Sequence, residues 1–216
     1  MTRDATIKRI VETGIIPIIR VPSSDDALRI VDAIKAAGID IIEITMTVPG
    51  AIEIMRDLGA RYGDELVLGA GTVLEAETAR LCMLAGAKFV VSPIVDEGML
   101  TCCRTHGVVA LPGALTPTEV VRAWRAGGDM VKVFPCGAVG GASYIRALKA
   151  PLPQIALVPT GGVSLETIGD FFKAGAAAVG AGADIVDLSK IREGRGDAIT
   201  ERARRYVEAV RKARGA

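Results

Sequence analysis

One lysine lies inside a stretch that otherwise has the composition of a buried strand. Lys132 stands between two valines in the run from Met130 to Phe134, within GGDMVKVFPCGAVGG. A desolvated ammonium group costs several kcal/mol unless it is paired or neutral. An apolar environment favours the neutral amine, and a neutral amine can attack a ketone and form a Schiff base. We therefore predict that Lys132 is a catalytic nucleophile.

A glutamate occupies a similar position in a second apolar run. In IDIIEIT, residues 39–45, Glu43 lies on the face opposite its two isoleucine neighbours, as Lys132 lies opposite its two valine neighbours. A carboxylate beside a Schiff base can shuttle the protons needed for carbinolamine dehydration and for carbon–carbon bond cleavage. We predict that Glu43 is this acid/base group. A buried structural ion pair between Glu43 and Lys132 is the alternative.

Two glycine-containing segments have the pattern of an anion site. VPTGGVS (158–164) and AVGAGAD (178–184) each end a predicted strand. Loops after strands seven and eight bind phosphate in many barrels, through backbone N–H groups and a helix N-terminus. Arg20 and Thr72 follow two further strands and are candidates to hold a substrate carboxylate, with solvated loop positions as the alternative.

A short unit recurs along the chain: a helix end, a glycine and then a β-branched run. The glycines of these units stand where a left-handed residue ends a helix. They are Gly38, Gly86, Gly107, Gly128 and Gly175. The segments between the runs have apolar residues at helical spacing, and two of them open with capping residues, SSDD and LTPTE. The tail, residues 197–215, is predicted as a final amphipathic helix with a solvated basic face.

The recurring unit predicts an α/β protein. The eight predicted strands lie in IIPIIRV, IIEIT, ELVLGAGT, FVVSP, VVALPG, MVKVFP, IALVPTGG and AVGAGA. Eight βα units in this length favour a single (β/α)8 TIM barrel with an N-terminal helix, residues 1–216 forming one domain. Lys132 and Glu43 would then both point into the barrel, near the carboxyl ends of the strands. An open doubly wound sheet is the alternative fold.

Composition excludes several classes of function. The 216 residues are 50% hydrophobic and carry 26 basic against 25 acidic side chains, so no basic surface for nucleic acid or an anionic membrane is expected. No stretch approaches the roughly 20 apolar residues of a membrane span, and the N-terminus lacks a signal-peptide core, which favours a cytoplasmic protein. Four cysteines without CxxC spacing are expected to be reduced. The single histidine, His106, argues against a histidine triad or a multi-histidine metal site.

Six phrases of the sequence resemble one enzyme family. IIEITMTVPGA, GAGTVL, FVVSPIVDEGM, PGALTPTE, MVKVFP and VPTGGVS, in this order, resemble the bacterial 2-keto-3-deoxy-6-phosphogluconate (KDPG) and 4-hydroxy-2-oxoglutarate (KHG) aldolases. The resemblance implies a class I aldolase without a cofactor or metal, usually a homotrimer. Such an enzyme cleaves a 2-keto acid to pyruvate and an aldehyde, which is glyceraldehyde 3-phosphate for KDPG and glyoxylate for KHG.

The resemblance also assigns roles to individual residues. It places the Schiff-base lysine at Lys132 and the acid/base glutamate at Glu43. The pyruvate pocket falls on Arg20, Thr72, Pro93 and Phe134. The phosphate site falls on Thr160, Gly161, Gly162, Gly180, Gly182 and Ala183.

The chain departs from the family pattern at two positions. Some members carry arginine where this chain has Thr47, so carboxylate binding is expected to depend more on Arg20. Some carry serine where this chain has Ala183, which leaves mostly backbone donors for a phosphate. Alternative functions are a 2-keto-3-deoxy-6-phosphogalactonate aldolase, another phosphate-binding barrel such as an isomerase or a metal-dependent decarboxylase, and a barrel that only binds a ligand.

Overall fold

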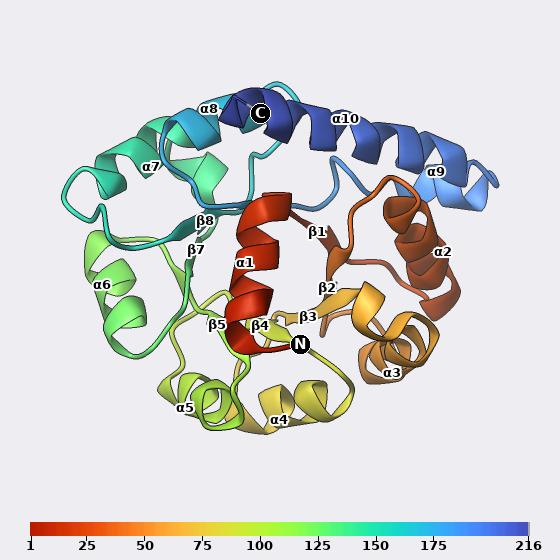
Figure 1. The fold of residues 1–216 in the computed structure, drawn as a ribbon, viewed down its shortest axis with the longest axis horizontal. Coiled ribbons are helices and arrows are strands. Elements are labelled where there is room, and N and C mark those ends of the chain that lie inside the picture. The colour runs from red at the N-terminus through yellow and green to blue at the C-terminus, as the bar shows by residue number, and fades with distance from the viewer. Residues whose placement is uncertain (216) are drawn as a thin grey trace.

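Short strands alternate with helices along the whole computed structural model, which describes residues 1–215 (Figure 1). The strands are β1 Ile15–Ile19, β2 Ile41–Thr45, β3 Val67–Gly71, β4 Phe89–Val91, β5 Val109–Leu111, β6 Gly113–Ala114, β7 Val131–Val133, β8 Leu157–Pro159 and β9 Val179–Ala181. The helices are α1 Arg3–Thr13, α2 Ser24–Lys35, α3 Ala51–Tyr62, α4 Ala76–Leu84, α5 Glu97–His106, α6 Pro117–Arg125, α7 Ala142–Lys149, α8 Ile168–Lys173, α9 Leu188–Arg192 and α10 Gly196–Arg214. Two 3₁₀ turns are η1 Gly63–Glu65 and η2 Cys136–Val139. Each segment predicted as a strand contains one, and the fifth is divided into β5 and β6.

The strands form a curled parallel sheet. Six of them pair in the order β5-β4-β3-β2-β1-β9, and the other three in the order β6-β7-β8. Only Pro112 separates β5 from β6, and an isolated parallel bridge between Thr160 and Gly180 joins the end of β8 to β9. The strand order follows the chain without the reversal that defines a doubly wound sheet. The alternative of a doubly wound sheet is therefore wrong.

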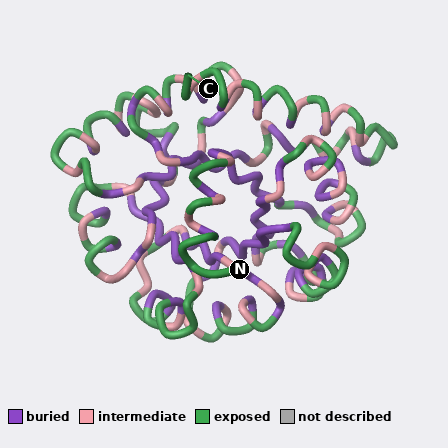
Figure 2. Tube along the Cα trace, in the orientation of Figure 1, coloured by how far each residue is buried: buried purple, intermediate pink, exposed green. Residues whose placement is uncertain are grey.

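The two faces of the sheet carry separate cores. Ile41 and Met130 belong to an inner apolar cluster, whereas Ile42 and Val131 belong to the outer cluster between the sheet and the helices. In Figure 2 the buried residues form a ring through the strands, and exposure increases on the outer helices. The predicted alternation of inward and outward side chains is confirmed, so Lys132 and Glu43 lie on the inner face.

Helix α1 covers the amino-terminal end of the sheet. It lies across the centre of the view in Figure 1, and its Ile10 is fully buried in the inner cluster. Arg3 forms an ion pair with Asp129, which directly precedes the strand segment of Lys132, at 2.5 Å. The inner cluster is therefore closed at this end by an apolar side chain rather than by solvent.

Most of the predicted helix ends are confirmed. Ser23 caps α2, and Thr116 with Glu119 forms a capping box on α6. Four of the five predicted glycines adopt positive φ: Gly38, Gly86, Gly107 and Gly175.

The prediction for Gly128 is wrong. Gly127 takes the left-handed position instead, with φ of 104°, because α6 ends one residue earlier than expected. Gly128 is needed for close packing, since a Cβ there would lie 2.7 Å from Pro112 Cγ.

Within residues 1–215, no helix combines the length and the apolar character that crossing a membrane requires.

Candidate active site

Lys132 extends from the central strand of the three-stranded sheet into the interior. Its backbone pairs with Gly113 on one side and with Val158 on the other, and only 5% of the residue is exposed. The Nζ atom lies 5.2 Å from the centroid of the Phe134 ring, two residues further along the same face. An aromatic face on one side and apolar strands around it supply the low-polarity environment that a nucleophilic amine needs.

Glu43 lies on β2, almost fully buried with 2% of the residue exposed. Burial raises the pKa of this carboxyl, and the nearby charges of Lys132 and then Arg20 partly oppose the rise. Its Oε1 atom has no hydrogen-bond partner among residues 1–215. A buried carboxyl with a free oxygen and a raised pKa is suited to exchanging protons with a bound reactant.

Gly71, which the sequence analysis did not single out, makes room for this carboxylate. It pairs with Thr45 across β2 and β3, and a Cβ built on it would lie 1.9 Å from Glu43 Oε1. The ring of Phe89 similarly occupies the space beside Gly69, the preceding glycine of the strand. The two glycines in the GAG sequence of β3 are thus needed to leave room for the side chains of Phe89 and Glu43. The sequence alone does not show this need, because it does not show which side chains face β3.

Two predicted pocket residues flank this centre from neighbouring strand ends. Thr72 follows Gly71 directly and is the one non-glycine residue with positive φ among residues 1–215, at 59°. The backbone of Pro93 lies against Gly113, the register partner of Lys132, since a Cβ on Gly113 would be 2.4 Å from the Pro93 carbonyl oxygen. Thr72 is therefore one residue away from the glycine that contacts Glu43, and Pro93 contacts the glycine that pairs with Lys132.

A cavity of about 440 Å³ opens beside Phe134 at the carboxyl ends of the strands. The predicted residues that line it are Arg20, Phe134, Thr160, Gly161, Gly162, Gly180, Gly182 and Ala183. Lys132, Glu43, Thr72 and Pro93 are not among its lining residues. The structure thus brings the two glycine loops and Arg20 together around one space, with Phe134 between that space and Lys132.

The glycine loops present backbone donors to this cavity. Gly161 and Gly162 have φ of 86° and 77°, a region that favours glycine. Among residues 1–215, the N–H groups of Gly162, Gly182 and Ala183 make no hydrogen bond to another backbone group. Unpaired N–H groups on a concave wall are the usual elements of an anion site.

Sequence reasoning missed several lining residues. Ile18, Val21, Val163 and Val186 give the cavity apolar walls, and Asp184 adds a carboxylate. Asp184 is held by two side chains of α10, Arg202 and Tyr206. Because α10 lies far along the chain, only the folded structure brings these groups to the cavity.

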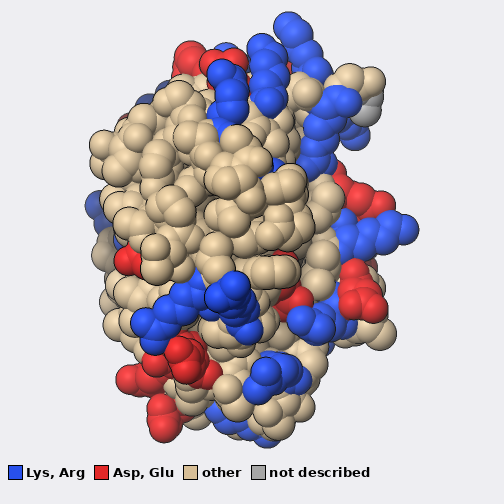
Figure 3. Space-filling view, turned by 90° about the vertical axis from the view of Figure 1, so that its left-hand side faces the viewer, with Lys and Arg blue, Asp and Glu red and all other residues tan. Residues whose placement is uncertain are grey.

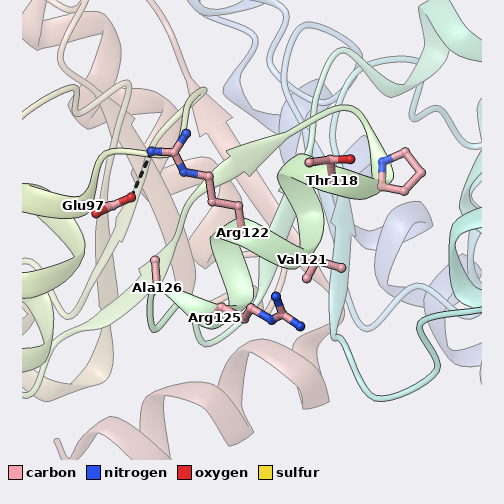
Figure 4. Close-up of a pocket in the computed structure, with 7 residues that line it drawn as sticks. Glu97, Thr118, Val121, Arg122, Arg125 and Ala126 are labelled. Atoms are coloured by element: carbon pink, nitrogen blue, oxygen red, sulfur yellow. Dashed lines mark hydrogen bonds and ion pairs between the residues drawn. The ribbon is translucent and has the colours of Figure 1, made fainter.

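A second concavity lies outside the sheet and does not contact this centre. The groove, of about 660 Å³, follows the outer face of α6 and is bridged by an ion pair between Glu97 and Arg122 at 2.9 Å (Figure 4). Its charged side chains are exposed and form no buried catalytic pair. Elsewhere in residues 1–215, no three His, Cys, Asp or Glu side chains are grouped so that they could hold a metal ion.

The model of the family described as KDPG and KHG aldolase matches residues 6–202. The chain belongs to this family. A 2-dehydro-3-deoxy-phosphogluconate aldolase of Haemophilus influenzae is 31% identical over 210 residues, 97% of this chain and 99% of the relative. A 2-dehydro-3-deoxy-6-phosphogalactonate aldolase of Escherichia coli is 34% identical over 200 residues, 92% of this chain and 95% of the relative. The protein is therefore an aldolase, an aldehyde-lyase.

Solved structures agree with the sequence relatives. A native KDPGal structure superposes with a TM-score of 0.86 at 32% identity, covering 94% of this chain and 96% of the other. A KDPG aldolase from Legionella pneumophila, with pyruvate captured as a covalent carbinolamine intermediate, has a TM-score of 0.85 at 28% identity, covering 92% and 96%. The curled parallel sheet of this aldolase is thus the fold of its family.

Proposed function

We propose that this aldolase cleaves KDPG to pyruvate and glyceraldehyde 3-phosphate through a Schiff base on Lys132. One observation carries the proposal. A buried lysine and a buried glutamate lie on the inner face of the sheet, beside a cavity at the carboxyl ends of the strands. Among residues 1–215, Oε1 of this glutamate has no hydrogen-bond partner, and three N–H groups on the cavity wall make no backbone hydrogen bond. The inner pair suits imine chemistry, and the N–H groups of the outer wall suit a phosphate group.

The steps follow from these positions. The neutral amine of Lys132 adds to the C2 ketone, and the Glu43 carboxyl protonates the hydroxyl of the carbinolamine, which leaves as water and gives a protonated imine. The carboxylate of Glu43 accepts the proton of the C4 hydroxyl, the C3–C4 bond breaks, and its electron pair passes into the imine to form an enamine. The aldehyde departs, the enamine regains a proton at C3, and water hydrolyses the imine to release pyruvate and the free amine.

Arg20 is the proposed partner of the substrate carboxylate. Among residues 1–215 it is the one cationic residue on the cavity wall, and its charge acts on Glu43. Thr72, Pro93 and Phe134 would enclose the three-carbon pyruvate part. Thr47 is exposed and its hydroxyl pairs with Thr45 at 2.7 Å, so it offers no second cation.

The substrate phosphate is assigned to the two glycine loops. Thr160, Gly161 and Gly162 would contribute one side of the site, and the turn from Gly180 to Ala183 the other. Support comes from the unpaired N–H groups and from the bridge that holds Thr160 against Gly180. Cleavage of KHG, which has no phosphate, would use the inner pair alone.

The galactonate epimer is a second candidate substrate. The relative that acts on 2-dehydro-3-deoxy-6-phosphogalactonate is 34% identical to this chain, slightly more than the Haemophilus influenzae phosphogluconate aldolase at 31%. The epimers differ at C4, where Glu43 would act. Comparing kcat/KM for the two phosphorylated epimers and for KHG assigns the substrate.

We also infer that the sheet forms a closed (β/α)8 barrel in a single domain and that the aldolase is a homotrimer. Closure is supported by the continuity of the chain through Pro112 and by the bridge from Thr160 to Gly180. Self-association is supported by the broad uncharged area in the upper part of the face shown in Figure 3, and by Trp124 and Val139, which are 42% and 39% exposed. Sedimentation equilibrium would test the trimer.

Borohydride reduction in the presence of pyruvate tests the central step. The wild-type chain should gain the mass of one reduced pyruvate on Lys132, whereas Lys132→Met should gain none and stay folded, because an apolar side chain suits β7. Imine trapping in the Lys132→Met variant would move the nucleophile elsewhere. No trapping in the wild type would indicate a different phosphate-binding barrel enzyme or a ligand-binding barrel.

A further inference from the structure

A carboxylate lies on the wall of the proposed phosphate site. Of the residues that the structure describes, Asp184 is the only acidic one lining the cavity, and it directly follows Ala183 in the β9 loop. Its side chain is 30% exposed. An uncompensated carboxylate at this place would repel a phosphate dianion, because two like charges a few ångströms apart interact strongly outside bulk water.

Helix α10 supplies the charge that compensates Asp184. The Nη2 atom of Arg202 lies 2.7 Å from Asp184 Oδ1, and its Nε donates to the Asp184 carbonyl oxygen. Tyr206 donates to the other carboxylate oxygen, Oδ2. Both side-chain oxygens of Asp184 thus have a partner on α10, Oδ1 in the ion pair with Arg202 and Oδ2 in the hydrogen bond from Tyr206. Arg202 itself is not among the residues that line the cavity.

One more acidic group lies near this cluster. Glu166, in the loop that follows β8, acts electrostatically on both Asp184 and Arg202, and its carboxylate accepts a hydrogen bond from Ser164 at 2.6 Å. The guanidinium of Arg202 therefore forms an ion pair with Asp184 and also acts electrostatically on the more distant carboxylate of Glu166. Removal of that one cation would leave both carboxylates of this cluster without a compensating charge.

We infer that Arg202 is a specificity-determining positioning residue, which neutralises Asp184 and so permits the cavity to accept a phosphorylated aldehyde portion. This inference rests on the proposed phosphate site. Arg202 acts through Asp184 and touches no reacting atom. If the ion pair only held the β9 loop against α10, loss of Asp184 and loss of Arg202 would instead impair KDPG binding equally.

Substitutions at the two partners separate charge compensation from tethering. Arg202→Met keeps much of the aliphatic stem, removes the cation, and should raise KM for KDPG about tenfold or more through repulsion by Asp184. Asp184→Asn removes the repulsive charge and leaves Arg202 in place, so KM for KDPG should stay the same or fall. Combining the two substitutions should recover at least about threefold of the loss seen in Arg202→Met.

Three further measurements complete the test. KM for KHG, which lacks the phosphate, should change by less than about twofold in every variant. Added salt should lower KM for KDPG in Arg202→Met and not in the double variant, because salt screens repulsion between exposed charges. Arg204→Met, which removes the exposed ion pair of Arg204 with Glu201 at 3.8 Å on the same helix, is the matched control and should behave like the wild type.

The outcomes that overturn the inference are distinct from those that overturn the proposed function. A higher KM for KDPG in both single variants, with no recovery in the double variant, would mean that the cluster only tethers the loop. Equal increases in KM for KDPG and KHG, with pyruvate trapping intact, would also mean that the cluster only tethers the loop. Failure of wild-type pyruvate trapping or of wild-type KDPG cleavage would instead remove the proposed function, and this inference with it.

Discussion

The carboxylate of Glu43 occupies the space in which a side chain at Gly71 would lie. A Cβ on Gly71 would be 1.9 Å from Glu43 Oε1, far inside van der Waals contact. Gly71→Ala should therefore displace the carboxylate, and a displacement near 1 Å can cost about 100-fold in rate. We expect a fall of that order in kcat for KDPG cleavage, with pyruvate trapping on Lys132 retained.

Gly169→Ala is the matched control, because nothing lies within 4 Å of a Cβ at that helical glycine. It should leave kcat unchanged. A Gly71→Ala variant with wild-type kcat would show that the carboxylate can move without consequence, against its proposed role.

The pH dependence of cleavage should report the environment of Glu43. To accept the C4 hydroxyl proton the carboxyl must be ionised, so the rate falls as pH decreases through its pKa. Burial raises that pKa above the ordinary glutamate value of 4.5, and the acidic limb should lie correspondingly higher. Glu43→Gln should remove this limb and lower kcat about 10²- to 10⁴-fold.

Profiles of kcat/KM against pH for the wild type and Glu43→Gln test this assignment. Glu53→Gln, which changes an exposed residue of α3, is the control. An acidic limb that persists in Glu43→Gln would assign the titration to another group. A loss below about threefold would mean that water moves the protons.

Bulk at Gly162 should impair phosphate binding more than loss of the Thr160 hydroxyl. Gly162 has φ of 77°, and a Cβ there would lie 2.8 Å from Gly137 Cα, so Gly162→Val strains the loop and pushes it away from η2. Thr160→Ala removes at most one hydrogen bond, about 1.5–3 kcal/mol with a charged acceptor. We expect the larger rise in KM for KDPG in Gly162→Val, measured against KHG in the same variants. Equal losses on both substrates would indicate a role in the fold alone.

Ile10 should contribute strongly to stability although α1 lies outside the sheet. The side chain is fully buried in the inner cluster, so Ile10→Ala should lower the free energy of unfolding by about 2–5 kcal/mol in urea titrations. Val11→Ala, at a position that is 37% exposed, should change it by less than about 0.5 kcal/mol. Similar values for the two variants would mean that α1 does not close the inner cluster.

The sequence was sufficient to predict the features that depend on local pattern. Alternation along two short strands placed Lys132 and Glu43 on the inner face, and the spacing of glycines and β-branched runs predicted each strand segment. The one incorrect helix end, Gly128 rather than Gly127, arose because two adjacent glycines satisfy the same local pattern. Only the contact with Pro112 distinguishes them.

Features that depend on contacts distant in sequence could not be predicted. The clearance that Gly71 provides for Glu43 joins two strands, and the compensation of Asp184 joins the β9 loop to α10. Arg202 lies in a segment whose basic residues were predicted to face solvent. Its ion pair depends on how α10 packs across the sheet, which residue spacing within the helix does not encode.

The closure of the amino-terminal end by α1 also constrains the order of events during turnover. With Ile10 filling that end, the products of the proposed reaction would leave from the opposite end of the sheet, where the cavity beside Phe134 lies. In that reaction pyruvate would remain covalently attached to Lys132 while the aldehyde lies toward the cavity. The aldehyde therefore departs first and pyruvate second, so pyruvate should inhibit competitively with KDPG, and in synthesis it is the substrate that must bind first.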